Sequence, residues 1–314
     1  MKIAVLFPGQ GSQFLGMGRE FIDSDSDCRA IMEMAASVCD FPLESLIQEG
    51  PMEELTRAVH LQPAITVTNL ICYQALKKAW GDKFSATCFA GHSLGEYSAL
   101  CAAGVLSVED TIRLVIKRGA LMEREGQLNP GGMRAVIGKN IDEIEAIIAD
   151  CSDAGIVTAA NHNTELQVVI SGSIPGLDAV SAVATEDGAR VIPLAVSVAN
   201  HSPLVANAVP DFADFMDGVE FKVPATPVYF NVSAGGERDT VKIKKMMASQ
   251  IASRVRWFET ITTMINEGVD TFIEVGPKTV LKGMMRKIAP QGYKYQALQF
   301  DTPEGLAKCM DKLA

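Results

Sequence analysis

The sequence predicts an α/β fold in which a small subdomain is inserted into a larger domain with a central parallel sheet. Short apolar segments alternate with helical stretches over most of the 314 residues, and 48% of the residues are hydrophobic, enough for a full core. Residues 127–197 show a strand and helix order of their own, which marks an insertion. We therefore expect a discontinuous large domain, residues 1–126 and 198–314, and a subdomain of residues 127–197.

The first half of the large domain begins with a strand at residues 2–7 that runs into the glycine-rich turn PGQGSQ. A buried strand at 85–90 leads directly into GHSLG, residues 91–95, after which a helix is expected. Ser107 and Asp110 are spaced as a cap for the next helix. The helices expected in this half cover residues 28–39, 63–80, 96–103 and 111–125.

The insertion follows the linker-like stretch QLNPGG and reads strand, helix, strand, strand, helix, strand. This βαββαβ order is that of a ferredoxin-like subdomain. The chain then returns to the large domain at residues 197–201. The expected segments are 133–137, 141–150, 156–160, 167–171, 174–187 and 190–194 in the insertion, then a long helix after Pro203, a strand at 228–232, a helix at 243–264 interrupted near Arg254, and a strand at 271–275.

Composition excludes several classes of protein. The net charge of −10 argues against a nucleic-acid partner, because phosphate binding needs a dominant basic surface. The apolar runs are too short for a membrane span, and no leader is visible, so we expect a cytoplasmic protein. Seven cysteines without a CxxC pair predict reduced thiols and no metal site.

Ser93 is the candidate nucleophile. It stands in a GxSxG motif placed between a strand and a helix, the arrangement in which a sharp turn exposes the serine hydroxyl. Gly91 and Gly95 keep neighbouring side chains clear of it. The helix N-terminus beneath the serine favours a developing oxyanion.

A serine nucleophile needs a base, and the chain has four histidines. His92 adjoins Ser93 and is poorly placed to reach back to it, while His60 lies in a helical segment where packing is expected. His162 is expected in a loop of the insertion, where it could line a cleft. His201 precedes Ser-Pro at the junction between the domains, and we prefer it as the base.

Arg118 is the third candidate. It falls in the middle of the helix expected at 111–125. In a cleft, a guanidinium can hold a carboxylate through two parallel hydrogen bonds. An arginine exposed on the helix surface is the competing interpretation.

A series of motifs in order identifies a family. The chain resembles the malonyl-CoA:acyl carrier protein transacylases of fatty acid synthesis, and their relatives in polyketide synthases, over nearly its whole length. The motifs are FPGQGSQ at 7–13, QPAI at 62–65, GHSLGEYSAL at 91–100, KRGALM at 117–122, GGMRAVIG at 131–138, QVVISG at 167–172, the His201 segment, NVSA at 231–234, VRW at 255–257 and EVGP at 274–277.

The resemblance implies a hydrolase-like large domain, a ferredoxin-like insertion and a site between them. It implies that malonyl-CoA acylates Ser93 and that the phosphopantetheine thiol of an acyl carrier protein then takes the malonyl group, in a ping-pong reaction without metal or redox cofactor. The implied roles are proton transfer by His201, an oxyanion hole from the main-chain N–H groups of Gln10 and Leu94, a malonyl carboxylate clamp from Arg118, and a main-chain carbonyl at Gln250 that orients the histidine.

The expected partners follow from the same resemblance, whereas the sequence does not fix the oligomeric state. The expected partners are malonyl-CoA and an acyl carrier protein, and a monomer is the default assembly. Carrier proteins are acidic, so a basic patch should receive one. Two sets of basic residues are candidates: Lys242, Lys244 and Lys245, and separately Lys282, Arg286 and Lys287.

Some positions depart from the family pattern and leave the acyl preference open. Glu123 replaces a common glutamine and could compete for Arg118, the loop at 163–167 differs, Asn200 precedes the histidine, and Lys278 follows EVGP in place of glycine. The sequence does not decide whether the protein acts in fatty acid synthesis or in polyketide synthesis. The rival functions are an acyl hydrolase that uses the same Ser–His pair and a non-catalytic module that docks carrier proteins.

Overall fold

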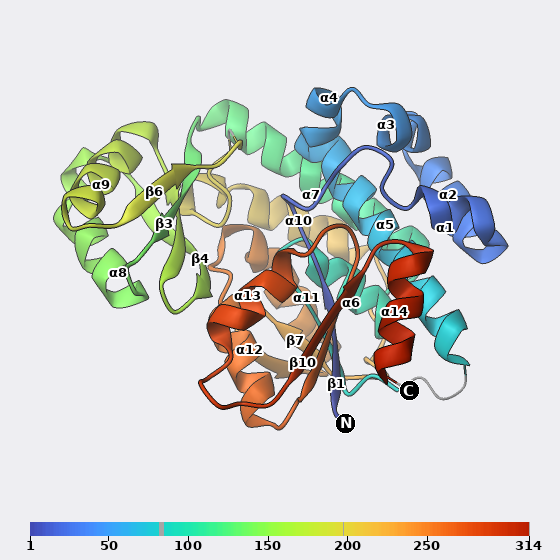
Figure 1. Cartoon of the computed structure of the whole chain (residues 1–314). Coiled ribbons are helices and arrows are strands. Elements are labelled where there is room, and N and C mark those ends of the chain that lie inside the picture. The colour runs from blue at the N-terminus through green and yellow to red at the C-terminus, as the bar shows by residue number, and fades with distance from the viewer. Residues whose placement is uncertain (82–84, 197, 314) are drawn as a thin grey trace.

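The computed structural model describes residues 1–81, 85–196 and 198–313. Residues 197 and 314, which end the predicted insertion and the predicted large domain, lie outside the described residues. The described strands form two sheets (Figure 1). The predicted limits of the two domains, 1–126 with 198–314 and 127–197, stay a prediction.

The larger sheet has the strand order β10-β9-β1-β2-β7-β8. All neighbours pair in parallel except β8, which lies antiparallel to β7. The predicted α/β class with a central parallel sheet is confirmed. The strands are β1 Ile3–Phe7, β2 Cys88–Gly91, β7 Val228–Phe230, β8 Gly235–Glu237, β9 Thr271–Val275 and β10 Gln296–Phe300.

Helices cover both faces of this sheet, and successive residues of β1 point to opposite faces. Val5 and Phe7 pack into the cluster that contains α2 and α5 to α7, whereas Ala4 and Leu6 pack against α12 and α13. The helices of this part are α1 Arg19–Ser24, α2 Ser26–Val38, α3 Leu43–Glu49, α4 Met52–Thr56, α5 Ala58–Trp80, α6 Gly95–Ala102, α7 Val108–Leu128, α10 Ala208–Asp217, α11 Thr240–Ser249, α12 Trp257–Asn266, α13 Val280–Ile288 and α14 Pro303–Leu313.

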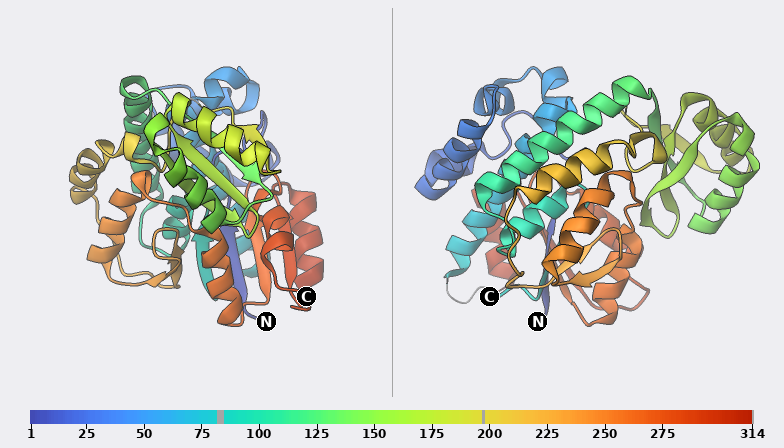
Figure 2. Two further views of the ribbon diagram at one scale, coloured as in Figure 1. Left: turned by 90° about the vertical axis from the view of Figure 1, so that its left-hand side faces the viewer. Right: turned by 180° about the vertical axis from the view of Figure 1, so that it is seen from behind.

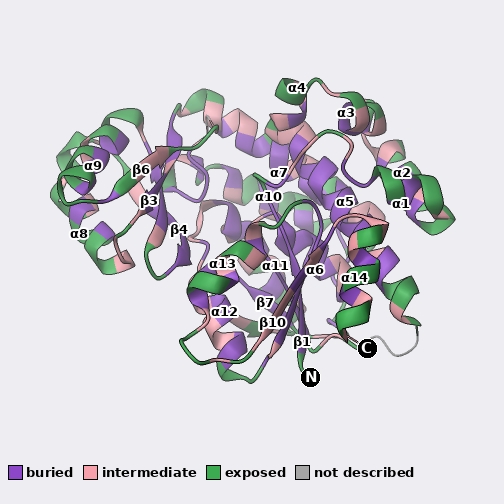
Figure 3. Cartoon of the chain, viewed as in Figure 1, coloured by how far each residue is buried: buried purple, intermediate pink, exposed green. Residues whose placement is uncertain are grey.

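The second sheet is antiparallel, with the order β4-β5-β3-β6, and α8 and α9 lie against it. This is the ferredoxin-like arrangement that the βαββαβ order predicts. The outer faces of α8 and α9 are exposed to solvent and are green in Figure 3, while most residues of the strands are buried. The elements are β3 Gly132–Ile137, α8 Ile141–Asp150, β4 Val157–Thr164, β5 Gln167–Gly172, α9 Ile174–Glu186 and β6 Arg190–Pro193.

Several sequence-based expectations about the helices and strands differ from the structure. A single long helix after Pro203 is wrong: a short 3-10 turn, Pro203–Val205, precedes α10. Helix α10 starts at Ala208, so Pro210, which has no N–H to donate, lies in the first turn, where an N–H would have no acceptor within the helix. Helix α5 begins at Ala58, with Pro63 inside it rather than at its start. The elements that were not expected are α1, α3, α4, β8, α13, β10 and α14.

The long helix α7 runs from the large sheet toward the smaller one, and the view from behind shows α10 lying along it (Figure 2). None of the described helices combines the length and the apolar content that a bilayer span requires. Within the same described ranges, no three His, Cys, Asp or Glu side chains are grouped to hold a metal ion.

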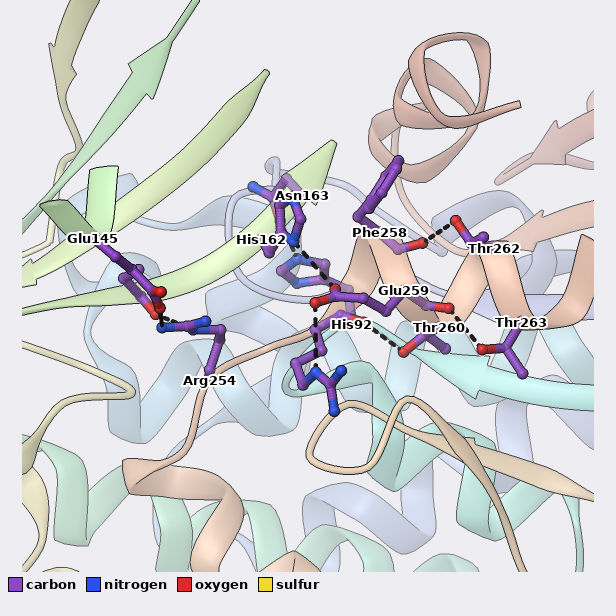
Figure 4. A network of polar contacts seen from close by, with 12 residues as sticks. His92, Glu145, His162, Asn163, Arg254, Phe258, Glu259, Thr260, Thr262 and Thr263 are labelled. Atoms are coloured by element: carbon purple, nitrogen blue, oxygen red, sulfur yellow. Dashed lines mark hydrogen bonds and ion pairs between the residues drawn. The ribbon is translucent and has the colours of Figure 1, made fainter. Parts of the chain in front are cut away.

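The segment between α11 and α12 is joined to the smaller sheet (Figure 4). The N–H of Val255 donates to Ala160 O at 2.8 Å, and the N–H of His162 donates to Val255 O at 2.9 Å. Arg254 donates to Ala159 O and pairs with Glu145 on α8. Strand β4 is thus paired with a segment of the large domain, which fixes the two sheets relative to each other.

Candidate active site

Three parallel strands end side by side at the site. In the ladder, Phe7 of β1 lies opposite Gly91 of β2, and Ala90 of β2 lies opposite Tyr229 of β7. The loops that follow these strands therefore meet at the carboxyl edge of the sheet, where ligands bind in open α/β folds. They carry Gln10, Ser93 and Asn231.

Ser93 occupies the sharp turn between β2 and α6 with a φ of 50°, in the left-handed region that non-glycine residues rarely adopt. A Cβ at Gly91 would lie 1.9 Å from the carbonyl carbon of Gly95, and one at Gly95 would lie 2.1 Å from Phe7 O. Both positions therefore exclude a side chain. The N–H of Ser93 donates to Asn231 Oδ1 at 2.7 Å, which anchors the strained turn from the neighbouring strand.

His201 lies against the serine, with its Nε2 2.7 Å from Ser93 Oγ. Its Nδ1 is 3.0 Å from both Gln250 O and Ser253 O. Because carbonyl oxygens only accept, Nδ1 carries the hydrogen and Nε2 is left to accept from the serine hydroxyl. Burial, assisted by the positive charge of Arg118, lowers the pKa of His201 to about 3, so the imidazole is neutral.

Arg118 enters the site from α7 and is buried, with 1% of its surface exposed. Its Nη1 donates to Gln62 Oε1 at 3.0 Å, and its Nη2 donates to Gln250 Oε1 at 3.0 Å and to Ser93 Oγ at 3.2 Å. Its Nε has no hydrogen-bond partner among the described residues. Burial lowers the pKa of Arg118, but an arginine stays protonated in proteins, and the side chains that hydrogen-bond to this cation, Gln62, Gln250 and Ser93, are all neutral.

A cavity of about 310 Å³ lies in front of these groups. The large domain contributes Ser93, Arg118 and His201, and the smaller sheet contributes Asn161 and Asn163. A second cavity of about 540 Å³ adjoins it. The lining residues that the two share are Gln10, Thr56, Ala195, Val196 and Asn200.

The structure brings the six predicted site residues together. Gln10, Ser93, Leu94, Arg118 and His201 all line the smaller cavity. Gln250 is buried behind it, where its carbonyl reaches the histidine as the resemblance implied.

The other histidines have structural partners. His162 was expected in a loop, and this is wrong: it lies in β4, buried beside Glu259 at 3.3 Å and outside the residues that line the cavity (Figure 4). His92 Nε2 lies 2.8 Å from Asn163 Oδ1, which joins the serine turn to the smaller sheet. His60 is in contact with Glu54 O and the ring of Phe41.

Comparison with known proteins gives a consistent match. A family model described as "Acyl transferase domain" matches residues 5–298. The malonyl CoA-acyl carrier protein transacylase of Bacillus subtilis strain 168 is 39% identical over 289 residues, which cover 91% of this chain and 90% of that protein. The chain belongs to the malonyl CoA-acyl carrier protein transacylase family. It is an acyltransferase, and the resemblance seen in the motifs is confirmed.

Solved structures of this transacylase family share the whole fold. The transacylase from Coxiella burnetii superposes with a TM-score of 0.95 at 32% identity, covering 100% of this chain and 98% of that one. A malonyl-transacylase solved in complex with a type II PKS acyl-carrier protein gives 0.94 at 32% identity, with 99% and 100% coverage. The two-sheet architecture is therefore that of the transacylases.

The structure shows the surroundings of the positions that depart from the usual transacylase pattern. Glu123 pairs with Arg57 at 2.6 Å rather than with Arg118. Residues 163–167 form the hairpin between β4 and β5, and Asn200 lines both cavities. Lys278 has a φ of 63°, so it occupies a left-handed position where glycine is favoured.

Three residues of this transacylase site were not expected from the sequence. Glu96, Asn231 and Gln62 are all buried and all hydrogen-bonded to the serine turn or to residues that contact it. The sequence did indicate their importance in one way, because each lies in a family motif: Glu96 in GHSLGEYSAL, Asn231 in NVSA and Gln62 in QPAI. A glutamate next to apolar residues in a short buried helix also indicates a specific partner.

Proposed function

We propose that this chain transfers a malonyl group from coenzyme A to the phosphopantetheine thiol of an acyl carrier protein through an ester on Ser93. The observation that carries the proposal is the pair of contacts to Ser93 Oγ, 2.7 Å to His201 Nε2 and 3.2 Å to Arg118 Nη2. One neighbour is a neutral base and the other is a buried cation. Together they provide proton removal and a carboxylate site within reach of one hydroxyl.

In the first half-reaction, His201 Nε2 takes the hydroxyl proton while Ser93 Oγ attacks the thioester carbonyl of malonyl-CoA. The tetrahedral intermediate collapses by breaking the C–S bond. His201 returns the proton to the departing sulfur, so free coenzyme A leaves and the malonyl ester remains on Ser93. The carbonyls of Gln250 and Ser253 hold the imidazole in the required tautomer.

The main-chain N–H groups of Gln10 and Leu94 are the proposed oxyanion hole. Neither N–H has a hydrogen-bond partner among the described residues. The register between β1 and β2 supports this role, since it places the loop at Gln10 beside the serine turn, and Leu94 immediately precedes the N-terminus of α6.

Arg118 is the proposed ligand of the malonyl carboxylate. The side chains that hydrogen-bond to the guanidinium are neutral, so a bound carboxylate would be its direct ion-pair partner. A neutral acyl group would leave the cation without that partner. This preference distinguishes malonyl transfer from handling of uncharged acyl chains.

In the second half-reaction, the thiol of the carrier's phosphopantetheine arm gives its proton to His201 and its sulfur attacks the malonyl ester. The ester C–O bond breaks, His201 protonates Ser93 Oγ, and malonyl thioester on the carrier is the product. Every proton in this sequence passes through His201. The scheme needs no cofactor beyond the coenzyme A thioester that serves as substrate.

Helix α13 is the proposed docking element for the carrier protein. Val280, Leu281 and Met284 of α13 line the smaller cavity, and the basic residues Arg286 and Lys287 are exposed in the last turn of the same helix. In contrast, the basic residues of α11 have local partners, because Lys242 pairs with Glu237 and Lys244 lies over the ring of Phe221. We therefore prefer Lys282, Arg286 and Lys287 over the set at 242–245.

Charge reversal tests this docking element. Arg286→Glu and Lys287→Glu should raise the KM for the carrier protein and weaken its salt dependence, while acylation by malonyl-CoA stays unchanged. Lys245→Glu on α11 is the matched control and should leave both constants unchanged. Equal effects of α11 and α13 variants would contradict the assignment.

The chain is proposed to act in the cytoplasm. All seven cysteines are free thiols, as expected in a reducing compartment. A monomeric state stays a prediction.

The decisive experiment for the proposed reaction is intact-mass analysis after brief exposure to malonyl-CoA, in the wild type and in Ser93→Ala. A malonyl adduct on the wild type that is absent from Ser93→Ala, and that disappears when carrier protein is added, is the expected result. Release of free malonate at the rate of transfer would instead show a hydrolase. Absence of any adduct on the wild type would indicate a non-catalytic module.

A further inference from the structure

Glu96 is a buried carboxylate directly beneath the serine turn. It lies in the first turn of α6 with 0% of its surface exposed. No Lys, Arg or His side chain among the described residues comes within ion-pair distance of it. Instead, Oε1 accepts from the main-chain N–H of Asn231 at 2.7 Å and Oε2 accepts from Gln250 Nε2 at 2.5 Å.

These bonds determine how the side-chain amide of Gln250 is oriented. Its Nε2 donates to Glu96 Oε2 and to Ser93 O at 2.7 Å, so both amide hydrogens have acceptors. Its Oε1 must then face the opposite way, where it accepts from Arg118 Nη2 at 3.0 Å. A flipped amide would set donor against donor at Arg118 and acceptor against acceptor at Glu96.

When Glu96 is ionised, Gln250 therefore separates two buried and opposite charges; burial raises the pKa of Glu96 to about 7. A carboxylate in direct contact with Arg118 would occupy the guanidinium and compete with the malonyl carboxylate. Through the intervening amide, Glu96 still attracts the guanidinium but leaves its free N–H groups for a ligand. The same carboxylate also supports the turn, since Asn231 receives the N–H of Ser93.

We propose that Glu96 is a positioning residue of the malonyl carboxylate site, holding Arg118 in place through the side chain of Gln250. This inference rests on the proposed function, because it assigns Arg118 to the malonyl carboxylate. It separates the two parts of Gln250: the main-chain carbonyl orients His201, and the side chain links Glu96 to Arg118.

The isosteric substitution Glu96→Gln tests the link. An amide offers one oxygen to the two donors that the carboxylate serves. The main-chain N–H of Asn231 cannot turn, so it retains the oxygen, and the new NH₂ group faces Gln250. The Gln250 amide is then driven to flip its Nε2 toward Arg118, which disturbs the carboxylate site while Ser93 and His201 keep their contact.

The measurement is the rate of acyl-enzyme formation with malonyl-CoA and, separately, with acetyl-CoA, which lacks the carboxylate. For Glu96→Gln we expect the second-order rate constant of acyl-enzyme formation with malonyl-CoA to fall at least tenfold. The same constant with acetyl-CoA should change less than threefold. Glu125→Gln is the matched control: Glu125 is equally buried, but it pairs with Arg124 and makes no contact with the serine turn. It should leave the malonyl-to-acetyl ratio unchanged.

A second variant, Gln250→Met, removes the link from its other end while keeping the main-chain carbonyl. If both residues act on Arg118 along one path, the double variant should show a malonyl-to-acetyl ratio no lower than the worse single variant. Equal loss of both activities in Glu96→Gln, or an unchanged ratio, would overturn the inference and leave Glu96 a structural residue. Failure of the wild type to form a malonyl-enzyme would instead refute the proposed function.

Discussion

Arg118 Nη2 lies 3.2 Å from Ser93 Oγ, so the cation that is proposed to bind the substrate carboxylate also contacts the proposed nucleophile. The serine hydroxyl can donate to His201 and accept from Arg118 at the same time. The guanidinium therefore lies between the serine hydroxyl and the proposed position of the substrate carboxylate.

Replacing Arg118 with alanine should weaken malonyl transfer selectively. Loss of a hydrogen-bonded contact to a charged group costs about 1.5–3 kcal/mol, or roughly 10- to 150-fold in rate. The check is kcat/KM with malonyl-CoA and acetyl-CoA, where acetyl transfer should fall much less. Lys117→Ala, one residue earlier on α7, is the control and should leave the ratio of the two substrates unchanged. Similar losses with both substrates in Arg118→Ala would contradict a role in carboxylate recognition.

His201 should make the protein less stable in acid. Its pKa of about 3 in the folded protein lies below the ordinary value of 6.5, so the unfolded chain binds a proton that the folded chain does not. Stability contributed by neutral His201 is complete above pH 6.5 and is lost as the pH falls toward 3. From pH 7 to pH 5 the loss is about 2 kcal/mol.

Denaturant unfolding of the wild type and of His201→Gln at both pH values measures this effect. Other groups also titrate in this range, among them Glu96 and Glu274, because burial raises their pKa values to about 7. Their contributions to the pH dependence cancel when the two proteins are compared. We expect the wild type to lose more stability than the variant. An identical pH dependence would show that His201 titrates normally.

Glu123→Gln, which restores the residue common in the family, should leave acyl selectivity within about twofold of the wild type. The reason is that Glu123 pairs with Arg57 and not with Arg118. Because Arg57 is about half exposed, loss of this ion pair should change the free energy of unfolding only slightly. A clear rise in malonyl preference would mean that Glu123 competes for Arg118.

Gly95→Ala should abolish activity and destabilise the fold, because the added Cβ would lie 2.1 Å from Phe7 O in a neighbouring buried strand. Gly283→Ala is the matched control. A Cβ at Gly283, within α13, meets no atom within 4 Å, and alanine is a better helix former by about 1 kcal/mol. Thermal unfolding and transfer rate should separate the two variants, and tolerance of Gly95→Ala would show that the turn can relax.

Lys278→Gly should increase stability by about 0.5–1 kcal/mol. Lys278 has a φ of 63°, which costs a residue with a side chain more than it costs glycine. The same substitution at Lys287, inside α13, should destabilise by about 1 kcal/mol, since glycine is a poor helix residue. Urea unfolding measures both. A loss of stability in Lys278→Gly would mean that its bond to Gly11 O outweighs the strain.

Much of the fold could be predicted because local sequence patterns determine where its helices, strands and turns form. The order of strand, GxSxG and helix places Ser93 on a turn, and the βαββαβ order predicts the ferredoxin-like sheet, which the topology confirms. The single long helix expected after Pro203 was wrong because apolar spacing does not show that a short 3-10 turn, Pro203–Val205, precedes α10. The loop expected at His162 was wrong because β4 extends past 160 to pair with the hairpin strand β5.

Some features of the site could be predicted from the sequence, and others are visible only in the structure. Residue types and their placement were sufficient to nominate Ser93, Arg118 and His201, and the family resemblance added Gln10, Leu94 and Gln250. The tertiary structure alone decided that Glu96 orients Gln250, that Gln250 faces Arg118, and that Glu123 does not. Those contacts join residues as far as 154 positions apart, and periodicity in a chain carries no information about which distant donor meets which buried acceptor.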